Sequence, residues 1–262
     1  MSIARLGAVD YLNARPLVYG LELRSDLFTL RFDVPSKCAA LLHEGSIDAG
    51  MIPSIEYLRG HDYRIVPGIG IISDGPVASV ALFTTTPLIG IRTIAADTSS
   101  RTSTGLLRVL CAERFGVDAE FHPMPPEPEL MLRRCDAALL IGDPALFLDH
   151  ERLGAEKIDL GEQWTSMTGL PFVWAFWAGR RAALSHEAVA ALGAARDAGV
   201  ADSDNVAKIY CGPDRAARGR AYLRENIYYV LGDREEEGLR AYYDLAERHG
   251  VVDRVMAPEF YR

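Results

Sequence analysis

A loop rich in hydroxyl groups, residues 98–104, is the strongest candidate for chemistry in this sequence. It follows a short apolar segment at residues 94–96 and precedes apolar residues with helical spacing from Leu106 to Phe115. A helix N-terminus offers unpaired N–H donors and partial positive charge, which suit a carboxylate or a phosphate. Ordinary capping, which needs only one hydroxyl, is the alternative. We predict an anion site formed by Thr98, Ser99, Ser100, Arg101, Thr102 and Ser103.

Three further polar residues lie in or beside expected strands. Asn13 and Arg15 occupy the turn between a strand at residues 3–9 and a helix that Pro16 begins. Ligands of open α/β sheets bind at the carboxyl ends of strands, so this turn is a candidate binding position. The alternative is that Asn13 or Arg15 only caps the turn. Ser79 lies in an apolar strand, where its hydroxyl either faces a ligand or is satisfied by the backbone.

The second half of the chain contributes weaker candidates. Asp143 precedes Pro144 at the expected start of a helix, and capping of that helix is the favoured interpretation of its carboxylate. Thr168 and Gly169 adjoin the segment that returns the chain to its first half, where they could add donors. We include these three residues among the candidates for ligand binding.

The sequence lacks the patterns of several other functional classes. Its net charge of -8 works against nucleic-acid binding, which needs a basic face. It contains no phosphate-binding Walker loop, no serine-hydrolase elbow, and no dinucleotide fingerprint around Gly68-Ile69-Gly70. The six histidines and four cysteines are not spaced as metal ligands. We therefore expect a small anionic ligand, with no metal and no cofactor.

The N-terminal residues predict the compartment. Residues 1–9 are too short and too interrupted to form the apolar region of a signal peptide, and no later segment is long enough to span a bilayer. We expect a cytoplasmic protein without membrane or nucleic-acid partners. The oligomeric state is left open.

Alternation of strands and helices predicts an α/β fold of two lobes. Strands are expected at residues 3–9, 28–34, 47–52, 77–85, 94–96, 135–141 and 169–177, with helices after most of them. The segments at 47–52 and 135–141 share an Asp-Ala pair, an apolar strand and a proline-marked helix start, which suggests similar units in both lobes. We expect residues 1–86 and 173–262 to form one lobe and 87–172 the other. Two lobes joined by two crossings is the organisation of a type II periplasmic-binding-protein fold.

Several segments together resemble the chorismate dehydratase family of the futalosine route to menaquinone. The most specific is Tyr11-Leu12-Asn13-Ala14-Arg15-Pro16-Leu17. Residues 45–53, 77–80, 100–103, 141–143 and 168–173 resemble the family in the same order. The resemblance spans residues 11–173 and covers little of the C-terminal helices.

The resemblance implies a two-lobed enzyme that eliminates water from chorismate, a dicarboxylate, to give 3-[(1-carboxyvinyl)oxy]benzoate without a cofactor. The asparagine and the strand serine of the family, matched here by Asn13 and Ser79, are then assigned to chemistry and substrate alignment. Two proton acceptors are open: Asp143, and the enolpyruvyl carboxylate of the substrate, which we favour. A binding module of the same fold without catalysis and an enzyme acting on a later futalosine-pathway intermediate are the competing hypotheses.

Overall fold

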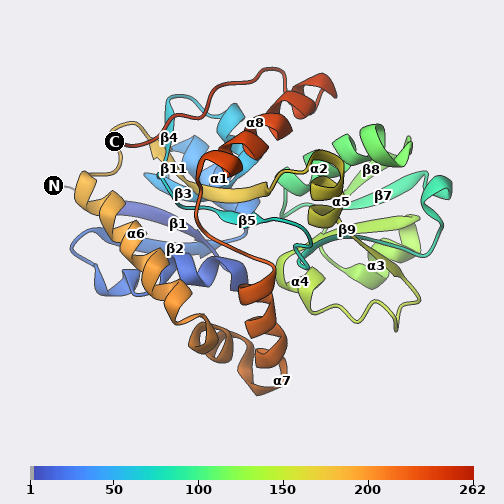
Figure 1. Ribbon diagram of the computed structural model, residues 1–262, viewed down its shortest axis with the longest axis horizontal. Coiled ribbons are helices and arrows are strands. Elements are labelled where there is room, and N and C mark those ends of the chain that lie inside the picture. The colour runs from blue at the N-terminus through green and yellow to red at the C-terminus, as the bar shows by residue number, and fades with distance from the viewer. Residues whose placement is uncertain (1–2) are drawn as a thin grey trace.

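The computed structural model describes residues 3–262 and contains two β-sheets that lie side by side (Figure 1). The first sheet has the strand order β2-β1-β3-β11-β4, with β5 paired to β11. Strand β1 is parallel to β2 and β3, whereas β11 runs antiparallel to β3, β4 and β5. Its strands are β1 (Ala4–Val9), β2 (Phe28–Asp33), β3 (Ala49–Pro53), β4 (Tyr63–Ile65), β5 (Ile71–Ser73) and β11 (Phe172–Arg180).

The second sheet is formed by one continuous part of the chain. Its strand order is β10-β6-β9-β7-β8, in which β7 is parallel to β8 and β9 while β6 is antiparallel to β9 and β10. These strands are β6 (Val80–Thr84), β7 (Thr93–Asp97), β8 (Glu120–Met124), β9 (Ala137–Ile141) and β10 (Glu156–Asp159). Strands β3 and β9 occupy equivalent places, each between one parallel and one antiparallel neighbour. This confirms the similarity of the two Asp-Ala units.

Helices surround the sheets and connect them. The α-helices are α1 (Pro35–Glu44), α2 (Thr102–Leu110), α3 (Pro128–Arg134), α4 (Gly142–Leu146), α5 (Leu160–Thr168), α6 (His186–Ala201), α7 (Ser203–Glu225) and α8 (Asp233–Arg248). Short turns of other helix types are η1 (Leu12–Val18), η2 (Leu21–Leu23), η3 (Ser54–Arg59), η4 (Leu88–Gly90) and η5 (Cys111–Phe115). Within residues 3–262, none of the helices is long and apolar enough to cross a membrane.

Both faces of the second sheet are covered by apolar side chains. Leu82 and Leu139 belong to the large core that also fills the first half of the molecule, whereas their neighbours Phe83 and Leu140 belong to a smaller core with Met131 of α3. Successive residues of a strand point to opposite faces, so consecutive apolar residues are expected where both faces are buried. The apolar runs of β6 and β9 are therefore explained by their central position in this sheet.

The sequence also predicts that Gly45 and Gly116 end helices and that Ser185 caps one, and the structure confirms these three ends. Gly45 and Gly116 end α1 and η5 with positive φ angles of 77° and 62°, and the Ser185 hydroxyl caps α6 by accepting from the Ala188 amide. The expected helix at Pro16 is wrong in its start and type. Residues 12–18 form a 3₁₀ turn with Pro16 inside it, so Asn13 and Arg15 lie within the turn instead of before it.

The expectation that residues 77–85 complete the first sheet is also wrong. Strand β6 pairs with β9 and β10 of the second sheet, so the chain crosses between the sheets before Val80. Thr86-Pro87 follows β6 and therefore lies within the part of the chain that forms the second sheet. An apolar run carries no information about which sheet it joins, because both sheets bury such strands. We therefore propose crossings at residues 74–79 and 169–171, with residues 3–73 and 172–262 as one lobe.

Candidate functional site

A cavity lies between the two sheets, at the carboxyl ends of their parallel strands. Val9 and Pro53 are the last residues of β1 and β3, and Ile141 is the last residue of β9. Its wall is mostly apolar with a few polar groups, as is typical of small-molecule sites. Its lining residues are Val9, Tyr11, Asn13, Pro35, Pro53, Ile71, Val77, Ser79, Val80, Ser100, Thr102, Ser103, Ile141, Gly142, Trp174 and Ala175. The candidates Asn13, Ser79, Ser100, Thr102 and Ser103 are thus brought together.

Asn13 contributes an unpaired amide oxygen to this cavity. Its Oδ1 atom is buried and accepts no hydrogen bond within the described residues 3–262. Leaving a buried polar atom unpaired costs about 1–3 kcal/mol. A polar atom left unpaired in a cavity wall is therefore suited to accept a hydrogen bond from a ligand.

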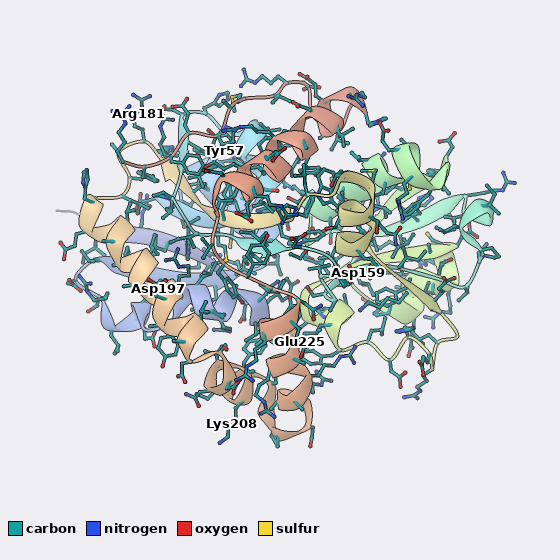
Figure 2. All side chains as sticks on the ribbon, in the orientation of Figure 1. Tyr57, Asp159, Arg181, Asp197, Lys208 and Glu225 are labelled. Atoms are coloured by element: carbon teal, nitrogen blue, oxygen red, sulfur yellow. The ribbon has the colours of Figure 1, made fainter. Side chains whose placement is uncertain are left out.

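Ser79 is held by an unusual backbone at the first crossing. Ala78 has a positive φ of 60°, which is unfavourable for a residue with a Cβ atom. The carboxylate of Asp159, at the N-terminus of α5 (Figure 2), accepts from the amides of Val77 at 3.0 Å and Ala78 at 2.6 Å. Lys157 donates to the Ala78 carbonyl at 2.6 Å. These contacts stabilise the strained turn that places Ser79 in the cavity wall.

The N-terminus of α2 supplies hydroxyl groups from the second sheet. Ser100 and Ser103 are hydrogen-bonded to each other at 2.8 Å, and Thr102 accepts from the Ile55 amide at 3.2 Å. All three residues are buried and line the cavity. With the first amides of the helix they form a group of donors suited to a carboxylate.

The other residues of the predicted anion loop lie outside the cavity. The Ser99 hydroxyl donates to Asp97 at 2.6 Å, and Thr98 borders a separate surface pocket. Arg101 donates to the buried carboxylate of Glu56 at 2.7 Å. The arginine thus anchors the loop to η3 and does not face the cavity.

Three other candidates, Arg15, Thr168 and Gly169, have structural contacts and do not line the cavity. The Arg15 guanidinium lies 4.9 Å from the ring centres of both Phe32 and Tyr210 and pairs with Asp10. The Thr168 hydroxyl donates to the Trp164 carbonyl, and Gly169 ends α5 with a φ of 71°.

The expected capping role of Asp143 is wrong. It lies inside α4, after the cap position of Ile141, and its carboxylate accepts from the Leu12 amide at 3.1 Å and the Tyr210 hydroxyl at 2.5 Å. Burial raises the pKa of Asp143, while the bonds from Tyr210 and Leu12 act in the opposite direction. Asp143 therefore fixes the turn that carries Asn13.

Contacts between the two halves hold the cavity closed. The Ser36 amide of α1 donates to the Ser99 carbonyl at 3.1 Å, and the Tyr242 hydroxyl of α8 donates to the Thr102 carbonyl at 3.0 Å. The bonds from Leu12 to Asp143 and from Arg101 to Glu56 join the same halves. The structure is therefore in a closed conformation.

Among the residues that join the two halves, Glu56 makes several ion-pair contacts. Its side chain is fully buried, yet it pairs with His43 at 3.0 Å, Arg59 at 2.5 Å and Arg101 at 2.7 Å. Burial acts to raise the pKa of Glu56, but the bond from His43 and the charges of the two arginines outweigh it, so the pKa is lowered. Glu56 is thus a carboxylate at neutral pH.

We expect Glu56→Gln to lower the free energy of unfolding at pH 7 by about 1–3 kcal/mol, since it weakens bonds to three donors that are partly screened by solvent. The lowered pKa means that the wild-type contribution is complete above about pH 4.3, the ordinary glutamate pKa, and is lost as pH falls through the lower folded value. Chemical denaturation from pH 7 to pH 3 should therefore show the two proteins converging in acid.

Glu113 provides the matched control, because it also pairs with a histidine and an arginine, His249 and Arg248, but at the surface. Glu113→Gln should change stability much less than Glu56→Gln. Equal effects of the two substitutions, or a difference from wild type that does not shrink as pH falls below about 4.3, would contradict the assignment of Glu56.

Tyr11 contributes an aromatic wall whose position depends on Gly142. A Cβ atom at residue 142 would lie 2.8 Å from ring carbons of Tyr11, and Gly142 has a φ of 62°. Such a distance is well below van der Waals contact, so any side chain here must displace the ring. Gly142 therefore permits the close packing of Tyr11 against the end of β9.

We expect Gly142→Ala to raise KM at least about tenfold, because it moves the Tyr11 ring into the ligand space. Gly116→Ala is the control: Gly116 has the same φ of 62°, but its new Cβ would have no neighbour within 4 Å. Both variants should lose about 1–2 kcal/mol of stability from backbone strain. Steady-state kinetics and thermal denaturation separate the two effects, and equal KM values would exclude the displacement of Tyr11.

Sequence reasoning missed several residues that complete the site. Tyr11 and Trp174 line the cavity, Asp159 holds the first crossing, and the Tyr222 hydroxyl lies 2.7 Å from Ser79 Oγ. Tyr11 is the first residue of the segment 11–17 that resembles the family, and its position two residues before Asn13 indicated that it lies near the site. Asp159 and Tyr222 are far from Ser79 in the sequence, so no local pattern indicates their contacts.

Comparisons with known proteins agree with the fold. Among solved structures, a protein from Archaeoglobus fulgidus aligns with a TM-score of 0.78 at 18% identity, covering 95% of this chain and 98% of that one. The periplasmic aliphatic sulphonate binding protein SsuA from Escherichia coli aligns with a TM-score of 0.62 at 19% identity, covering 100% and 94%. The chain therefore has the two-lobed periplasmic-binding-protein fold, with the cavity between its lobes.

Sequence comparison identifies closer relatives. A chorismate dehydratase from Thermus thermophilus is 33% identical over 192 residues, which are 67% of this chain and 69% of the relative. A chorismate dehydratase from Campylobacter jejuni is 31% identical over 176 residues, 64% of each chain. A family model described as menaquinone biosynthesis matches residues 4–248. Since this match covers nearly the whole sequence, the chain belongs to the menaquinone biosynthesis family.

Proposed function

We propose that this protein is a chorismate dehydratase, a hydro-lyase that converts chorismate into 3-[(1-carboxyvinyl)oxy]benzoate. Its family and two relatives named for this activity support the proposal. The cavity between the lobes combines apolar walls with a few hydroxyl and amide groups, as small-molecule sites do. We further propose a cytoplasmic location and a reaction that needs neither a cofactor nor a macromolecular partner.

The observation that carries the proposal is the neutral, hydrogen-bonding character of the cavity. No carboxylate, imidazole or cationic side chain is among its lining residues in the part of the chain that the structure describes, residues 3–262. Acidic walls would repel a dianion. Hydroxyls and helix N-terminal amides instead bind carboxylates through directed bonds, and the apolar walls strengthen those bonds by excluding water.

The reaction needs little more than orientation and charge placement. The C3–H bond breaks, its electron pair moves into the ring, and the C4–O bond breaks as the hydroxyl leaves. The product ring is aromatic, so the elimination is strongly favourable overall. The C3 proton is vinylogous to the ring carboxylate, so negative charge develops on that carboxylate during deprotonation. Donors fixed around it lower the barrier.

We assign complementary roles to the two groups of polar residues. Ser100, Thr102 and Ser103, with the first amides of α2, bind a carboxylate of the substrate. Ser79 donates to the substrate from the opposite wall, and the Asn13 amide orients it. An amide has no useful basicity near neutral pH, so Asn13 does not accept the proton.

The enolpyruvyl carboxylate of the substrate is the proton acceptor in this proposal. Asp143 is the alternative carboxylate, but both of its oxygens accept protein hydrogen bonds and it does not line the cavity. The substrate carboxylate is attached through the ether oxygen on C3 itself and can reach the C3 proton. It then passes the proton to the departing hydroxide, so one water leaves and the acceptor is regenerated.

Incubation of the purified protein with chorismate tests the proposal. We expect a catalytic change in the ultraviolet spectrum and a product whose mass is lower by one water. Binding without chemical change would instead support a ligand-binding module. Conversion only of later futalosine-pathway intermediates would support a different enzyme of the pathway.

A further inference from the structure

The hydroxyl of Tyr222 lies behind Ser79 as seen from the cavity, and Tyr222 does not line the cavity itself. Tyr222 belongs to α7 and is 2% exposed, and its Oη atom lies 2.7 Å from Ser79 Oγ. Ser79 itself is fully buried and faces the cavity on its other side. Tyr222 therefore contacts Ser79, to which we assign substrate alignment, but does not itself line the cavity.

The direction of this hydrogen bond follows from the partners available to each hydroxyl. Within residues 3–262, Ser79 Oγ is the only acceptor found for the Tyr222 hydroxyl. If Ser79 donated to Tyr222, the buried phenol proton would have no acceptor, which is costly. If Tyr222 donates instead, the Ser79 proton is free to point into the cavity. In the second arrangement both hydroxyl protons have an acceptor once a ligand is bound: that of Tyr222 bonds to Ser79 Oγ, and that of Ser79 bonds to the ligand.

Burial keeps Tyr222 in the protonated form that this arrangement requires. It raises the pKa of the phenol well above its usual value, although the contacts with the Ser79 and Asn13 side chains act in the opposite direction. The phenol therefore donates at any working pH. A rigid donor behind Ser79 also removes rotational freedom from the serine hydroxyl before the substrate arrives.

We propose that Tyr222 is a positioning residue that donates to Ser79 Oγ and thereby directs the Ser79 proton toward the substrate. The inference rests on the proposed function, since it assigns a role within the same site. It extends the site to α7, which lies beyond residues 11–173 that carry the sequence resemblance.

Tyr222→Phe tests the inference, because it keeps the ring and removes only the hydroxyl. We expect kcat for chorismate to fall about 10- to 100-fold with a smaller change in KM, since orientation of the Ser79 hydroxyl matters most in the transition state. Tyr229→Phe is the matched control. Tyr229 is also buried, at 4% exposed, and its hydroxyl has no partner within the described residues. Its loss should leave kcat unchanged.

A double-mutant cycle distinguishes positioning from a general structural role. If Tyr222 acts through Ser79, adding Tyr222→Phe to Ser79→Ala should cause little further loss of kcat. The same four proteins, compared by thermal denaturation, should show coupling between the two hydroxyls. If Tyr222→Phe alone folds poorly, the double variant provides the test. It removes both hydroxyls, so neither is left without its partner, and it should fold better than Tyr222→Phe alone.

The outcomes separate this inference from the proposed function. A wild-type protein that fails to dehydrate chorismate overturns the proposed function. An active wild type with an equally active Tyr222→Phe variant overturns only the role of Tyr222. Independent, multiplicative losses in the double mutant would also overturn it, because Tyr222 would then act by another route.

Discussion

Asn13→Ala is expected to lower kcat about 100- to 1,000-fold without loss of stability. Removing one preorganised hydrogen-bonding group from an active site has effects of this size. The Asn13 oxygen is buried without a partner, so alanine removes an unsatisfied atom, which offsets the loss of the contact between the Asn13 side chain and Tyr222. Steady-state kinetics with chorismate and thermal denaturation should show lower activity together with an equal or higher unfolding temperature.

Asn205→Ala is the control for Asn13. The Asn205 amide donates to Asp202 at an exposed position away from the cavity, so its removal should change neither kcat nor KM. Near wild-type kinetics for Asn13→Ala would remove the residue from the mechanism. A large loss of stability would show instead that the amide has a structural partner.

Asp159→Asn is expected to lower both stability and activity. Asp159 Oδ1 accepts from Val77, Gly161 and Glu162, whereas Oδ2 accepts only from Ala78. An asparagine whose oxygen keeps the three bonds of Oδ1 directs an N–H group at the Ala78 amide, which leaves this partly buried donor unsatisfied at a cost of about 1 kcal/mol. The strained turn should then relax and move Ser79, lowering kcat at least about tenfold.

Asp136→Asn is the matched control for this prediction. Asp136 Oδ2 likewise accepts from two backbone amides, those of Arg92 and Thr93, but at the ends of β7 and β9 remote from the cavity. It should reduce stability without reducing kcat. If Asp159→Asn behaves in the same way, the turn at Ala78 does not depend on this carboxylate to place Ser79.

Features set by nearby residues were predictable from the sequence. Gly45 and Gly116 end their helices as expected, and Ser185 caps α6, because each depends on local backbone geometry. The convergence of Asn13 with Ser100 and its neighbours was predictable for a related reason. Loops at the carboxyl ends of parallel strands meet at one edge of a sheet, and two such edges face each other here.

Features set by tertiary partners were not predictable. Arg15 is two residues from Asn13 along the chain, yet its guanidinium lies 4.9 Å from the ring centre of Tyr210 of α7 and outside the cavity. Asp143 has the sequence context of a helix cap but binds the turn of the other lobe. The sheet that β6 joins was also wrongly predicted, since its apolar residues suit either core.

The position of β11 has a consequence for the order in which the lobes form during synthesis. Strands β4 and β5 pair with β11 and with no other strand among the described residues, so they have no sheet partner until residues 172–180 have been made. The second sheet, at residues 80–159, is complete before that point. Contacts between nearby residues form at lower entropic cost than distant ones, and domains fold as units during synthesis. We therefore expect the lobe in the middle of the chain to fold first and the lobe containing the N-terminal strand to be completed last.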